Sequence, residues 1–361
     1  MITPGLGRYE VVLDNQWFLR ELTQSITMEE SLDEIAYRAV IKIVATSDFP
    51  GIRNGQPIRV SGIPFDGKEM AYLLHPAVVW DIQSLNRGVK HITVTAYDLT
   101  IYLAKSDDER LFPAGQTASQ RLSVYAEEWG IPLGQVADTG IPLARALYRP
   151  QSIWSMIQKD LQETVAKGGE LFRPRMTPDG LSLIPIGAND VIWVLEAEQN
   201  IEELGQHRTL EGAVTRVKVL GTKRGSPEVQ INTSGMSLQD IAKLSTGEGK
   251  QQEMPSPVLA VVDGDTATYG TIQKVLQDSK IKSIADAQTA GEQVITKTGF
   301  IEMFTVRGID INTIRAGDRV MLNSMELIVC SLQRECGTLG HLTLELASRD
   351  EIRRRYFARP I

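Results

Sequence analysis

The stretch IRNGQPIRVSG, residues 52–62, has a near echo in IRAGDRVMLNS, residues 314–324. Each copy begins with Ile-Arg, continues with one residue and a glycine, and then enters a strand-like run. Glycine permits a sharp turn, and the alternating residues after it can enter a sheet. Turn followed by strand is also among the commonest local patterns, so coincidence stays open. The position of the copies, one in each of two β-rich parts of the chain, favours a repeated device.

The first β-rich part covers residues 9–105, where β-branched and aromatic residues alternate with clusters of Gly, Pro, Asn and Asp. We expect strands in YEVVLD, AVIKIVAT, PIRVSG and HITVTAYDLTIYL. In the last segment the apolar residues nearly alternate, so that one face can be buried: Ile92, Val94, Ala96 and Leu99. Short strands with frequent turns predict a small barrel or sandwich.

The middle of the chain changes to a mixed α/β pattern. TASQRLSVYAEEWG predicts a helix with Thr117 as its N-cap and Gly130 just after its end. SIWSMIQKDLQETVAKGG predicts a second helix, flanked by Ser152 and Gly168. ELFRPRMTPDGLSLIPIG then predicts a hairpin with its turn at residues 178–180.

The β pattern returns from about Glu202. We expect strands in TLEGAVTRVKVLG, FIEMFTVRGID, DRVMLNSMELIVCSLQREC and GHLTLELA, and a helix over residues 283–299. Residues 221–257 are polar, rich in Gly, Pro and Ser and poor in aromatic residues. This composition predicts an exposed excursion that is partly mobile.

These patterns predict an α+β fold that is mainly β, with two β-rich domains flanking a mixed α/β insert; that both are small and β-barrel-like is what the family resemblance described below implies. The expected first β domain covers residues 1–105, and the insert covers residues 106–198. The second β domain covers residues 199–350 and carries the excursion, and residues 351–361 form a C-terminal tail. A chain of 361 residues is too long for one ordinary core, which agrees with several domains.

Composition and charge exclude some classes of protein. Hydrophobic residues make up 42% and charged residues 23%, as in soluble globular proteins. No stretch has the ~18 uninterrupted apolar residues of a membrane helix, and MITPGLGRYE does not resemble a signal peptide, so we expect folding in a cytoplasm. The net charge of -7 argues against a dedicated nucleic-acid binder.

No cluster of residues predicts a metal or a catalytic site. Cys330, Cys336 and His341 form a C-x5-C-x4-H pattern, which is not a common zinc spacing and has no evident fourth ligand. Two cysteines do not make a disulfide framework. We therefore expect no metal and no cofactor, and we interpret both cysteines as reduced hairpin residues.

Two acidic pairs are candidates for catalysis or calcium binding. Glu127 and Glu128 are adjacent on a predicted helix and therefore point apart. Asp263 and Asp265 lack the glycine and terminal glutamate that a calcium loop needs at set positions, so a loop turn is favoured. A glycosidase needs two carboxylates about 5–10 Å apart in a cleft, and the sequence places no pair in that way. We expect no enzymatic activity.

The C-terminal run RDEIRRRYFARPI is basic and aromatic. Such a run can contact nucleic acid or an acidic patch on a protein partner. Because the rest of the chain is acidic, we favour docking on a protein partner.

Three segments carry a resemblance to a known family. YDLTIYLAKSDDERLFPAGQTASQRLSVYAEEWGIPLG (residues 97–134) resembles a segment of the hub proteins of contractile phage tails. The specific likeness is to tail proteins of defective prophages of Gram-positive bacteria. It continues in residues 138–164 and in residues 283–322, in the same order, and spans residues 90–345. Ala316 departs from it, because the family often has proline in that turn.

The resemblance implies two related β-barrels in each chain and a ring-shaped homotrimer. Six barrels would then face a six-fold tail tube, and the opposite side would meet a central spike. The implied partners are the tail tube protein, the central spike protein and other baseplate proteins, with DNA passing through the lumen without specific binding. The implied location is the baseplate of a virion tail or tail-like particle, assembled in a bacterial cytoplasm. A cell-wall hydrolase or a carbohydrate-binding module of a baseplate is the alternative.

Overall fold

The computed structural model describes residues 7–47, 49–221, 233–246, 256–278, 281, 283–337 and 340–358. The chain divides into two compact units. The first unit contains residues 1–207 and 302–360, and the second contains residues 208–301. Within the described ranges, no helix has both the length and the apolar character that are needed to cross a membrane.

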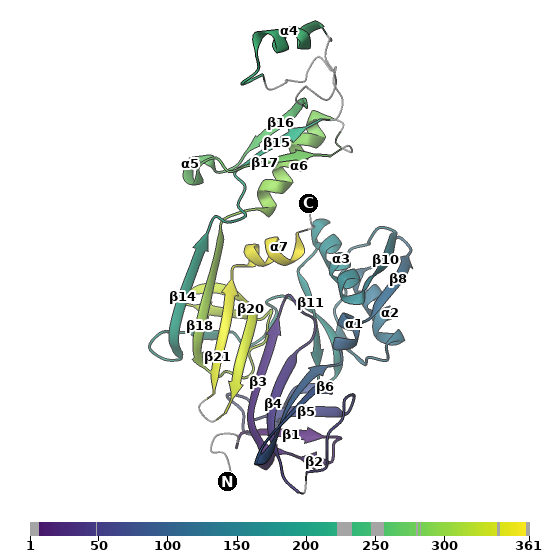
Figure 1. The fold of residues 1–361 in the computed structure, drawn as a ribbon, viewed down its shortest axis with the longest axis vertical. Helices are drawn as coiled ribbons and strands as arrows, with labels where there is room; N and C mark the ends of the chain where they lie inside the picture. The colour runs from purple at the N-terminus through teal and green to yellow at the C-terminus, as the bar shows by residue number, and fades with distance from the viewer. Residues whose placement is uncertain are drawn as a thin grey trace. The chain divides into compact units, whose positions relative to one another are not determined.

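A 13-stranded sheet forms the main part of the first unit (Figure 1). Neighbouring strands follow the order β14-β18-β21-β20-β3-β4-β7-β6-β5-β1-β2, and β19 pairs with β20 and β13. The strands are β1 (Tyr9–Leu13), β2 (Trp17–Phe18), β3 (Thr23–Ser31), β4 (Arg38–Ala45), β5 (Pro57–Gly62), β6 (Ala71–Arg87), β7 (Val89–Asp98), β13 (Trp193–Leu195), β14 (Ile201–Thr209), β18 (Ile301–Ile309), β19 (Arg319–Leu322), β20 (Met325–Cys336) and β21 (His341–Ala347). Within the described residues this path ends at β14 and β2 without closing. The predicted mainly β, α+β class is confirmed.

The end of β7 differs from the prediction. The residues expected to face the core are buried or half-buried: Ile92, Val94, Ala96 and Leu99. However, β7 ends at Asp98, so the prediction of a strand through Leu103 was wrong. Asp98 Oδ1 accepts the Thr100 N–H (2.9 Å) and turns the chain into the short helix α1 (Ile101–Lys105).

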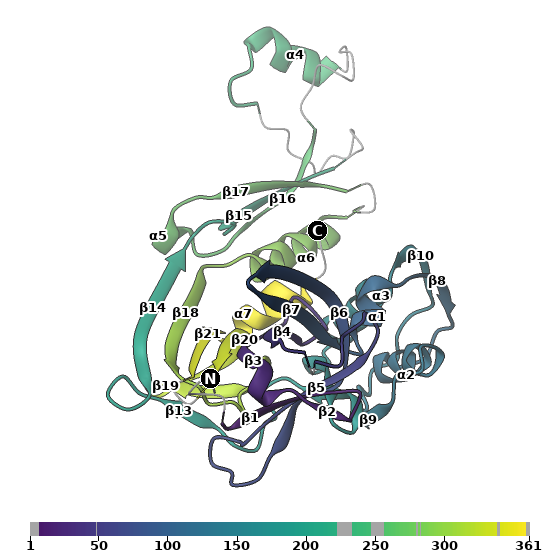
Figure 2. The same ribbon diagram turned by 60° about the horizontal axis from the view of Figure 1, so that its bottom comes forward.

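The sheet contains two sets of four strands with the same connections. In the first set β5, β6 and β7 follow one another as antiparallel neighbours, and β7 also pairs with β4. In the second set β19, β20 and β21 do the same, and β21 also pairs with β18. Each set leads into a helix, because β7 precedes α1 and β21 precedes α7 (Arg349–Phe357). The first set is purple to blue in Figure 2 and the second is green to yellow. The shared order identifies an internal structural repeat.

β3 and β20 join the two sets. They pair antiparallel, with Ser31 opposite Ser331 and Ile26 opposite Cys336. The other edge of β3 pairs with β4. Strands from both ends of the chain therefore share one sheet, and their buried side chains form one core.

The region between the two sets is a mixed α/β structure. It contains β8 (Asp107–Phe112), α2 (Ala118–Glu128), β9 (Leu133–Val136), β10 (Ala146–Ser152), α3 (Ile153–Ala166), β11 (Phe172–Thr177) and β12 (Gly180–Pro185). Both predicted helices are present. Thr117 caps α2 in a capping box with Gln120, and Ser152 caps α3 by accepting the Ser155 N–H. The predicted hairpin is also confirmed, since β11 pairs with β12.

The C-terminal basic run begins as a helix that packs on its own chain. Ile352 and Phe357 of α7 are buried in the core that α3 also lines. Gln162 Nε2 on α3 donates to the Tyr356 carbonyl oxygen at 3.2 Å. Residues 359–361 lie outside the described residues.

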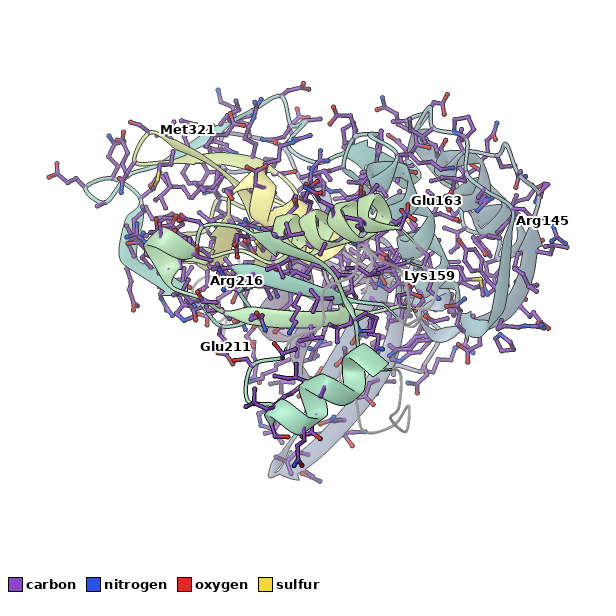
Figure 3. All side chains as sticks on the ribbon, turned by 90° about the horizontal axis from the view of Figure 1, so that it is seen from above. Arg145, Lys159, Glu163, Glu211, Arg216 and Met321 are labelled. Carbon is purple, nitrogen blue, oxygen red and sulfur yellow. The ribbon has the colours of Figure 1, made fainter. Side chains whose placement is uncertain are left out.

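The second unit is a small sheet with one long helix. Its strands are β15 (Arg216–Leu220), β16 (Val258–Asp263) and β17 (Gln273–Gln277), with β15 in the centre. The predicted helix is α6 (Ile284–Lys297), which is capped by Ser283 and packs on β15 and β16. The short helix α5 (Thr266–Tyr269) precedes β17. Figure 3 labels Arg216, whose guanidinium pairs with Asp263 on the neighbouring strand.

The predicted excursion at residues 221–257 lies partly outside the described residues, which omit 222–232 and 247–255. A helix that was not predicted, α4 (Leu238–Thr246), lies within it. Leu238 is 85% exposed, which agrees with an exposed segment.

Candidate functional site

The first copy of the echoed sequence forms a tight turn before β5. The Arg53 N–H donates to Gln56 Oε1 (3.1 Å), and the Gln56 N–H donates back to the Arg53 carbonyl (3.3 Å). The Gly55 N–H donates to the Val79 carbonyl on β6 (2.8 Å), and the Val79 N–H donates to the Gln56 carbonyl (2.9 Å). Gly55 has φ +80°, which glycine adopts without strain.

The second copy forms the same turn before β19. The Arg315 N–H donates to Asp318 Oδ2 (2.8 Å), and the Asp318 N–H donates back to the Arg315 carbonyl (3.1 Å). The Gly317 N–H donates to the Val329 carbonyl on β20 (2.7 Å), and the Val329 N–H donates to the Asp318 carbonyl (2.9 Å). Gly317 has φ +82°. Four matched hydrogen bonds and a matched glycine therefore make the echo a structural repeat, not a coincidence of sequence.

The insert covers the second turn. The Gly187 N–H donates to the Gly317 carbonyl (2.8 Å), and Arg175 on β11 donates to the Ala316 carbonyl (2.7 Å). The first turn has no such cover, since Arg53 and Gly55 are exposed while Gly317 is buried. The second turn is therefore the place where the first β region, the insert and the second β region meet.

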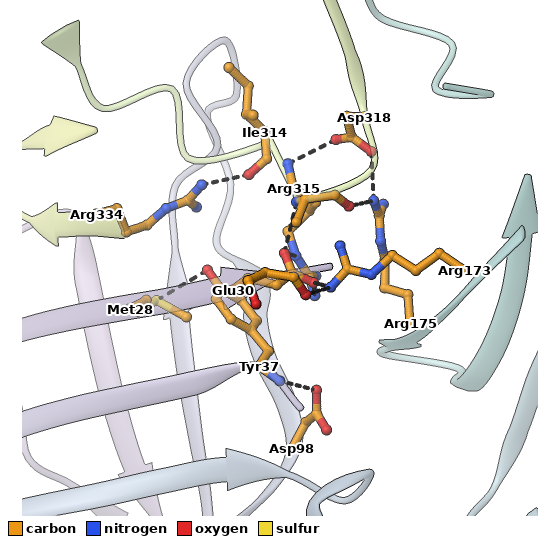
Figure 4. A network of polar contacts seen from close by, with 12 residues as sticks. Met28, Glu30, Tyr37, Asp98, Arg173, Arg175, Ile314, Arg315, Asp318 and Arg334 are labelled. Atoms are coloured by element: carbon orange, nitrogen blue, oxygen red, sulfur yellow. Dashed lines mark hydrogen bonds and ion pairs between the residues drawn. The ribbon is translucent and has the colours of Figure 1, made fainter. Parts of the chain in front are cut away.

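A cluster of five charged residues fills this meeting point, and we call it the Glu30 cluster (Figure 4). Its members come from β3, from β11 and from the second turn: Glu30, Arg173, Arg175, Arg315 and Asp318. Three ion pairs join them: Glu30 pairs with Arg173 and with Arg315, and Arg175 pairs with Asp318.

Glu30 is the centre of the cluster. Its carboxylate accepts from Arg173 Nη2 (2.9 Å), from Arg315 Nε (2.7 Å) and Nη2 (2.8 Å), and from the Ala316 N–H (3.0 Å). The side chain is 2% exposed. Four donors on one buried carboxylate give full compensation for its burial.

The electrostatics keep Glu30 ionised. Burial alone would raise the pKa of this carboxyl, but Arg173 and Arg315 outweigh burial and hold the pKa well below its usual range. Burial lowers the pKa of Arg173 to about 10, although Glu30 opposes the change. Glu30 and Arg173 thus keep fixed charges at neutral pH, which suits a structural tie and not proton transfer.

A further buried arginine outside the cluster, Arg334, also holds the second turn. Arg334 on β20 donates through Nη2 to the Ile314 carbonyl (2.6 Å), just before the turn. Its Nε lies 3.5 Å from Asp310 Oδ1. On the far side of the cluster, Asp98 Oδ2 accepts the Tyr37 N–H (2.9 Å), and burial raises the pKa of Asp98 to about 6.

The residues of the cluster were not singled out from the sequence, although one signal was present. In β3 the buried positions alternate as Ile26, Met28 and Glu30, so a glutamate occupies the inward phase of a strand. A charge at such a position calls for buried partners. The sequence does not show which arginines supply them, because Arg173 and Arg315 lie more than 140 positions away.

The cysteines and the histidine considered above lie on neighbouring strands without forming a site. Cys330 and Cys336 on β20 are free and buried, and burial raises the pKa of each thiol to about 12. His341 begins β21, and its Nδ1 lies 3.1 Å from Glu202 Oε2. In the part of the chain that the structure describes, no group of three or more His, Cys, Asp or Glu residues could hold a metal ion.

The carboxylates of the two acidic pairs have separate local contacts. Glu128 at the end of α2 pairs with Arg110, while Glu127 is exposed. Asp263 pairs with Arg216, and Asp265 caps α5 by accepting the Thr268 N–H (3.0 Å). Glu128 and Asp263 thus serve ion pairs, and Asp265 serves as a helix cap.

Comparison with known proteins identifies the fold. The chain is similar to the 43 kDa tail protein of prophage MuSo2 from Shewanella oneidensis, with a TM-score of 0.66 and 13% identity over 95% of this chain and 99% of that one. It is similar to a tail protein from Neisseria meningitidis, with a TM-score of 0.63 and 14% identity over 98% and 100%. It is also similar to the E. coli protein c3393, a component of the type VI secretion system, with a TM-score of 0.50 and 9% identity over 91% and 74%.

At these identities the likeness shows a shared fold. No curated protein matches the sequence. The model of the YQBQ-like family matches residues 26–332, which is most of the chain and includes both turns. The chain belongs to the YQBQ-like family.

Proposed function

We propose that the chain is a structural component of a phage tail or tail-like baseplate, and that it forms the hub between the tail tube and the central spike. Three copies form a ring-shaped trimer. Each copy contributes two related β modules, from residues 1–105 and 199–350, and the insert of residues 106–198 and the tail of residues 351–361 are attached to them. Six β modules then face a six-fold tube, while three chains meet a three-fold spike.

The internal repeat is the observation that carries this proposal. Two sets of four strands share their connections, and each set contains the same glycine turn with the same four hydrogen bonds. A trimer of such a chain presents six similar modules. This number is what a connection between six-fold and three-fold structures requires.

The family and the shared fold support the same role. The similar structures from Shewanella and Neisseria are tail proteins, and the E. coli protein is described as similar to the T4 phage tail proteins gp27 and gp5. The partners that follow are the tail tube protein, the central spike protein and other baseplate proteins. The location that follows is the tail of a virion or tail-like particle. The role is structural and not enzymatic.

The open ends of the large sheet are the surfaces that we assign to ring contacts. In the described residues β14 pairs only with β18, and β2 pairs only with β1, so each has a free edge. β2 exposes two large aromatic side chains, with Trp17 46% and Phe18 67% exposed. Free edges are normally covered in native proteins, and a contact between two different edges closes into a ring of three when it relates neighbouring copies by a 120° rotation.

The mass of the purified protein is the first test. Mass photometry of a trimer of 40.0 kDa chains gives a species of about 120 kDa, and negative-stain images of the same sample show a central hole. If only monomer is present, the protein is mixed with the tube and spike proteins, because these can act as templates. No association with either partner, together with normal particles in the absence of this protein, contradicts the proposal.

A pair of variants locates the contact. Phe18→Ser removes an exposed aromatic side chain from the edge strand, and we expect it to shift the trimer toward monomer. Leu238→Ser is the matched control, because it removes an even more exposed apolar side chain from α4 in the other unit. A trimer that persists equally in both variants moves the contact away from β2.

We also propose that DNA passes through the lumen of the ring without specific binding. A lumen that is strongly basic in the assembled ring contradicts this.

A further inference from the structure

A cavity of about 190 Å³ lies beside the Glu30 cluster. It is lined by both arginines of β11, by the second turn and by the loop after β12, and its lining includes Arg173, Arg175, Gly317, Asp318, Asn189 and Asp190. A single buried water needs only ~10–15 Å³ by the same kind of measure. One water therefore does not fill this space.

The cluster beside the cavity has one positive charge more than its carboxylates neutralise. Three guanidinium groups face two carboxylates, Glu30 and Asp318. Glu30 is saturated by four donors, and Asp318 accepts from Arg175 Nη2 (2.6 Å) and from the Arg315 N–H. Asp98 acts on Arg315 at the far side of the cluster and is not among the residues that line the cavity. Asp190 does line the cavity but is exposed at its rim, where solvent screens its charge. The positive charge nearest the cavity is thus incompletely compensated.

Two donors of these arginines also have no acceptor. Within the described residues, Arg173 Nη1 and Arg175 Nε are buried and make no hydrogen bond. The Arg173 side chain is only 6% exposed. Arg173 Nη1 points toward the second turn, since a Cβ added at Gly317 would lie 3.8 Å from it. Arg173, Arg175 and Gly317 all line the cavity, so both arginines that carry an unpartnered donor lie beside it.

We propose that this cavity binds a small oxyanion, a carboxylate or a phosphate, held by Arg175 and Arg173. An oxyanion supplies the negative charge that the cluster lacks and the acceptors that its guanidinium groups lack. The Asn189 side chain, which also lines the cavity, does not serve as the acceptor for these guanidinium groups. Its Nδ2 already donates to the Val191 and Arg319 carbonyls, and its Oδ1 accepts the Arg319 N–H. The site is independent of the assembly role proposed above.

Thermal unfolding of the full chain tests the site. The protein is titrated with sodium phosphate and with sodium acetate, each against sodium chloride at equal pH and ionic strength. We expect at least one anion to raise the Tm by roughly 2–4 °C once it exceeds its Kd about fivefold. A rise with phosphate alone indicates a phosphate site, a rise with acetate alone indicates a carboxylate site, and a rise with both indicates a site that accepts either group. The absence of any rise above the chloride reference overturns the proposal.

Three variants separate the site from a general effect of salt. Arg175→Gln should weaken anion binding roughly tenfold or more, because it removes charged hydrogen bonds. Arg149→Gln is the matched control with the same change of net charge at an exposed position, and it should bind like the parent chain. An equal anion effect in both variants overturns the site.

Asp190→Asn keeps the test decisive if Arg175→Gln does not fold. This residue is exposed, so its replacement leaves the fold intact. Removal of the rim carboxylate should tighten anion binding roughly 1.5- to 5-fold. Unchanged or weaker binding in this variant contradicts a site in this cavity.

Discussion

The turns at Gly55 and Gly317 have the same backbone hydrogen bonds but different surroundings. At the first turn the capping side chain is the neutral Gln56, and the preceding Arg53 is exposed. At the second turn the capping side chain is the charged Asp318, and the preceding Arg315 pairs with buried Glu30. The insert covers only the second turn. One backbone device can therefore serve as a simple strand start or as the anchor of a charged junction, depending on what packs over it.

The largest expected effect concerns the charge that only the second turn requires. Glu30→Gln leaves Arg173 and Arg315 buried without a counter-charge, and we expect a loss of about 3–5 kcal/mol in the free energy of unfolding. Urea unfolding followed by tryptophan fluorescence measures this in the first unit, because all five tryptophans lie outside residues 208–301.

The neighbouring residue on the same strand is the control for this variant. Glu29 pairs with Arg38, and both side chains are more than a third exposed. Glu29→Gln should therefore cost less than ~1 kcal/mol. A similar loss in both variants would show that the second turn is no more dependent on buried charge than the surface is.

The next expected effect compares the two glycines. Gly55→Ala and Gly317→Ala both place a side chain at positive φ, which costs roughly 1–2 kcal/mol. At Gly55 the new Cβ meets nothing within 4 Å, whereas at Gly317 it lies 3.3 Å from Arg173 Cδ. We expect Gly317→Ala to cost about 1–3 kcal/mol more. Equal losses in parallel urea titrations would remove the distinction between an open and a covered turn.

A smaller effect, dependent on pH, belongs to the first set of strands alone. Asp98 ends β7 and turns the chain toward α1, whereas the uncharged Ser348 stands between β21 and α7 and caps α7. The pKa of Asp98 is about 6 in the folded chain and ~3.9 when unfolded. The folded state binds more protons between these values, so this group makes stability fall by roughly 2 kcal/mol as pH rises from about 4 to 6.

The slope of stability against pH tests this assignment. In Asp98→Asn the contribution to the slope between pH 4 and 6 disappears, while Ser348→Ala leaves the slope unchanged although it removes a helix cap. The slope is compared and not the absolute stability, because asparagine has an NH2 group in place of one of the two acceptor oxygens of Asp98. The loss of that acceptor lowers the stability at every pH. An unaltered slope in Asp98→Asn assigns the pH dependence to another group.

The smallest expected loss of stability belongs to the arginine of the first turn, and the arginine of the second turn is its comparison. Arg53→Gln changes an exposed side chain and should alter stability by less than ~0.5 kcal/mol. Arg315→Gln, at the matching position, removes two of the four donors to Glu30 and should cost several times more. Equal and small losses would mean that Arg173 alone compensates Glu30.

The parts of the fold that depend on local pattern were predictable from the sequence. The caps at Thr117 and Ser152, the hairpin at residues 178–180 and the echoed turns all depend on neighbouring residues. The end of β7 was missed, because the side chain of Asp98 overrides the apolar pattern that continues to Leu103.

The parts that depend on distant contacts were not predictable in this way. The pairing of β3 with β20 and the ion pairs of Glu30 join residues that are roughly 140 to 300 positions apart. The echo marks Arg315 as part of a turn, but nothing local in the sequence marks Arg173 or Arg315 as a partner of a buried glutamate. A glutamate in the inward phase of β3 signals that a partner exists, but only the folded chain identifies it.

The pairing between β3 and β20 also has a consequence for synthesis on the ribosome. β3 leaves the ribosome early, but the strand that covers one of its edges is made about 300 residues later, which takes roughly 15–60 s at ordinary rates of translation. During that interval the edge of β3 is open to pairing with other nascent chains. Completion of the sheet is therefore a late event in synthesis, and chains that terminate before residue 325 leave a strand edge that favours aggregation.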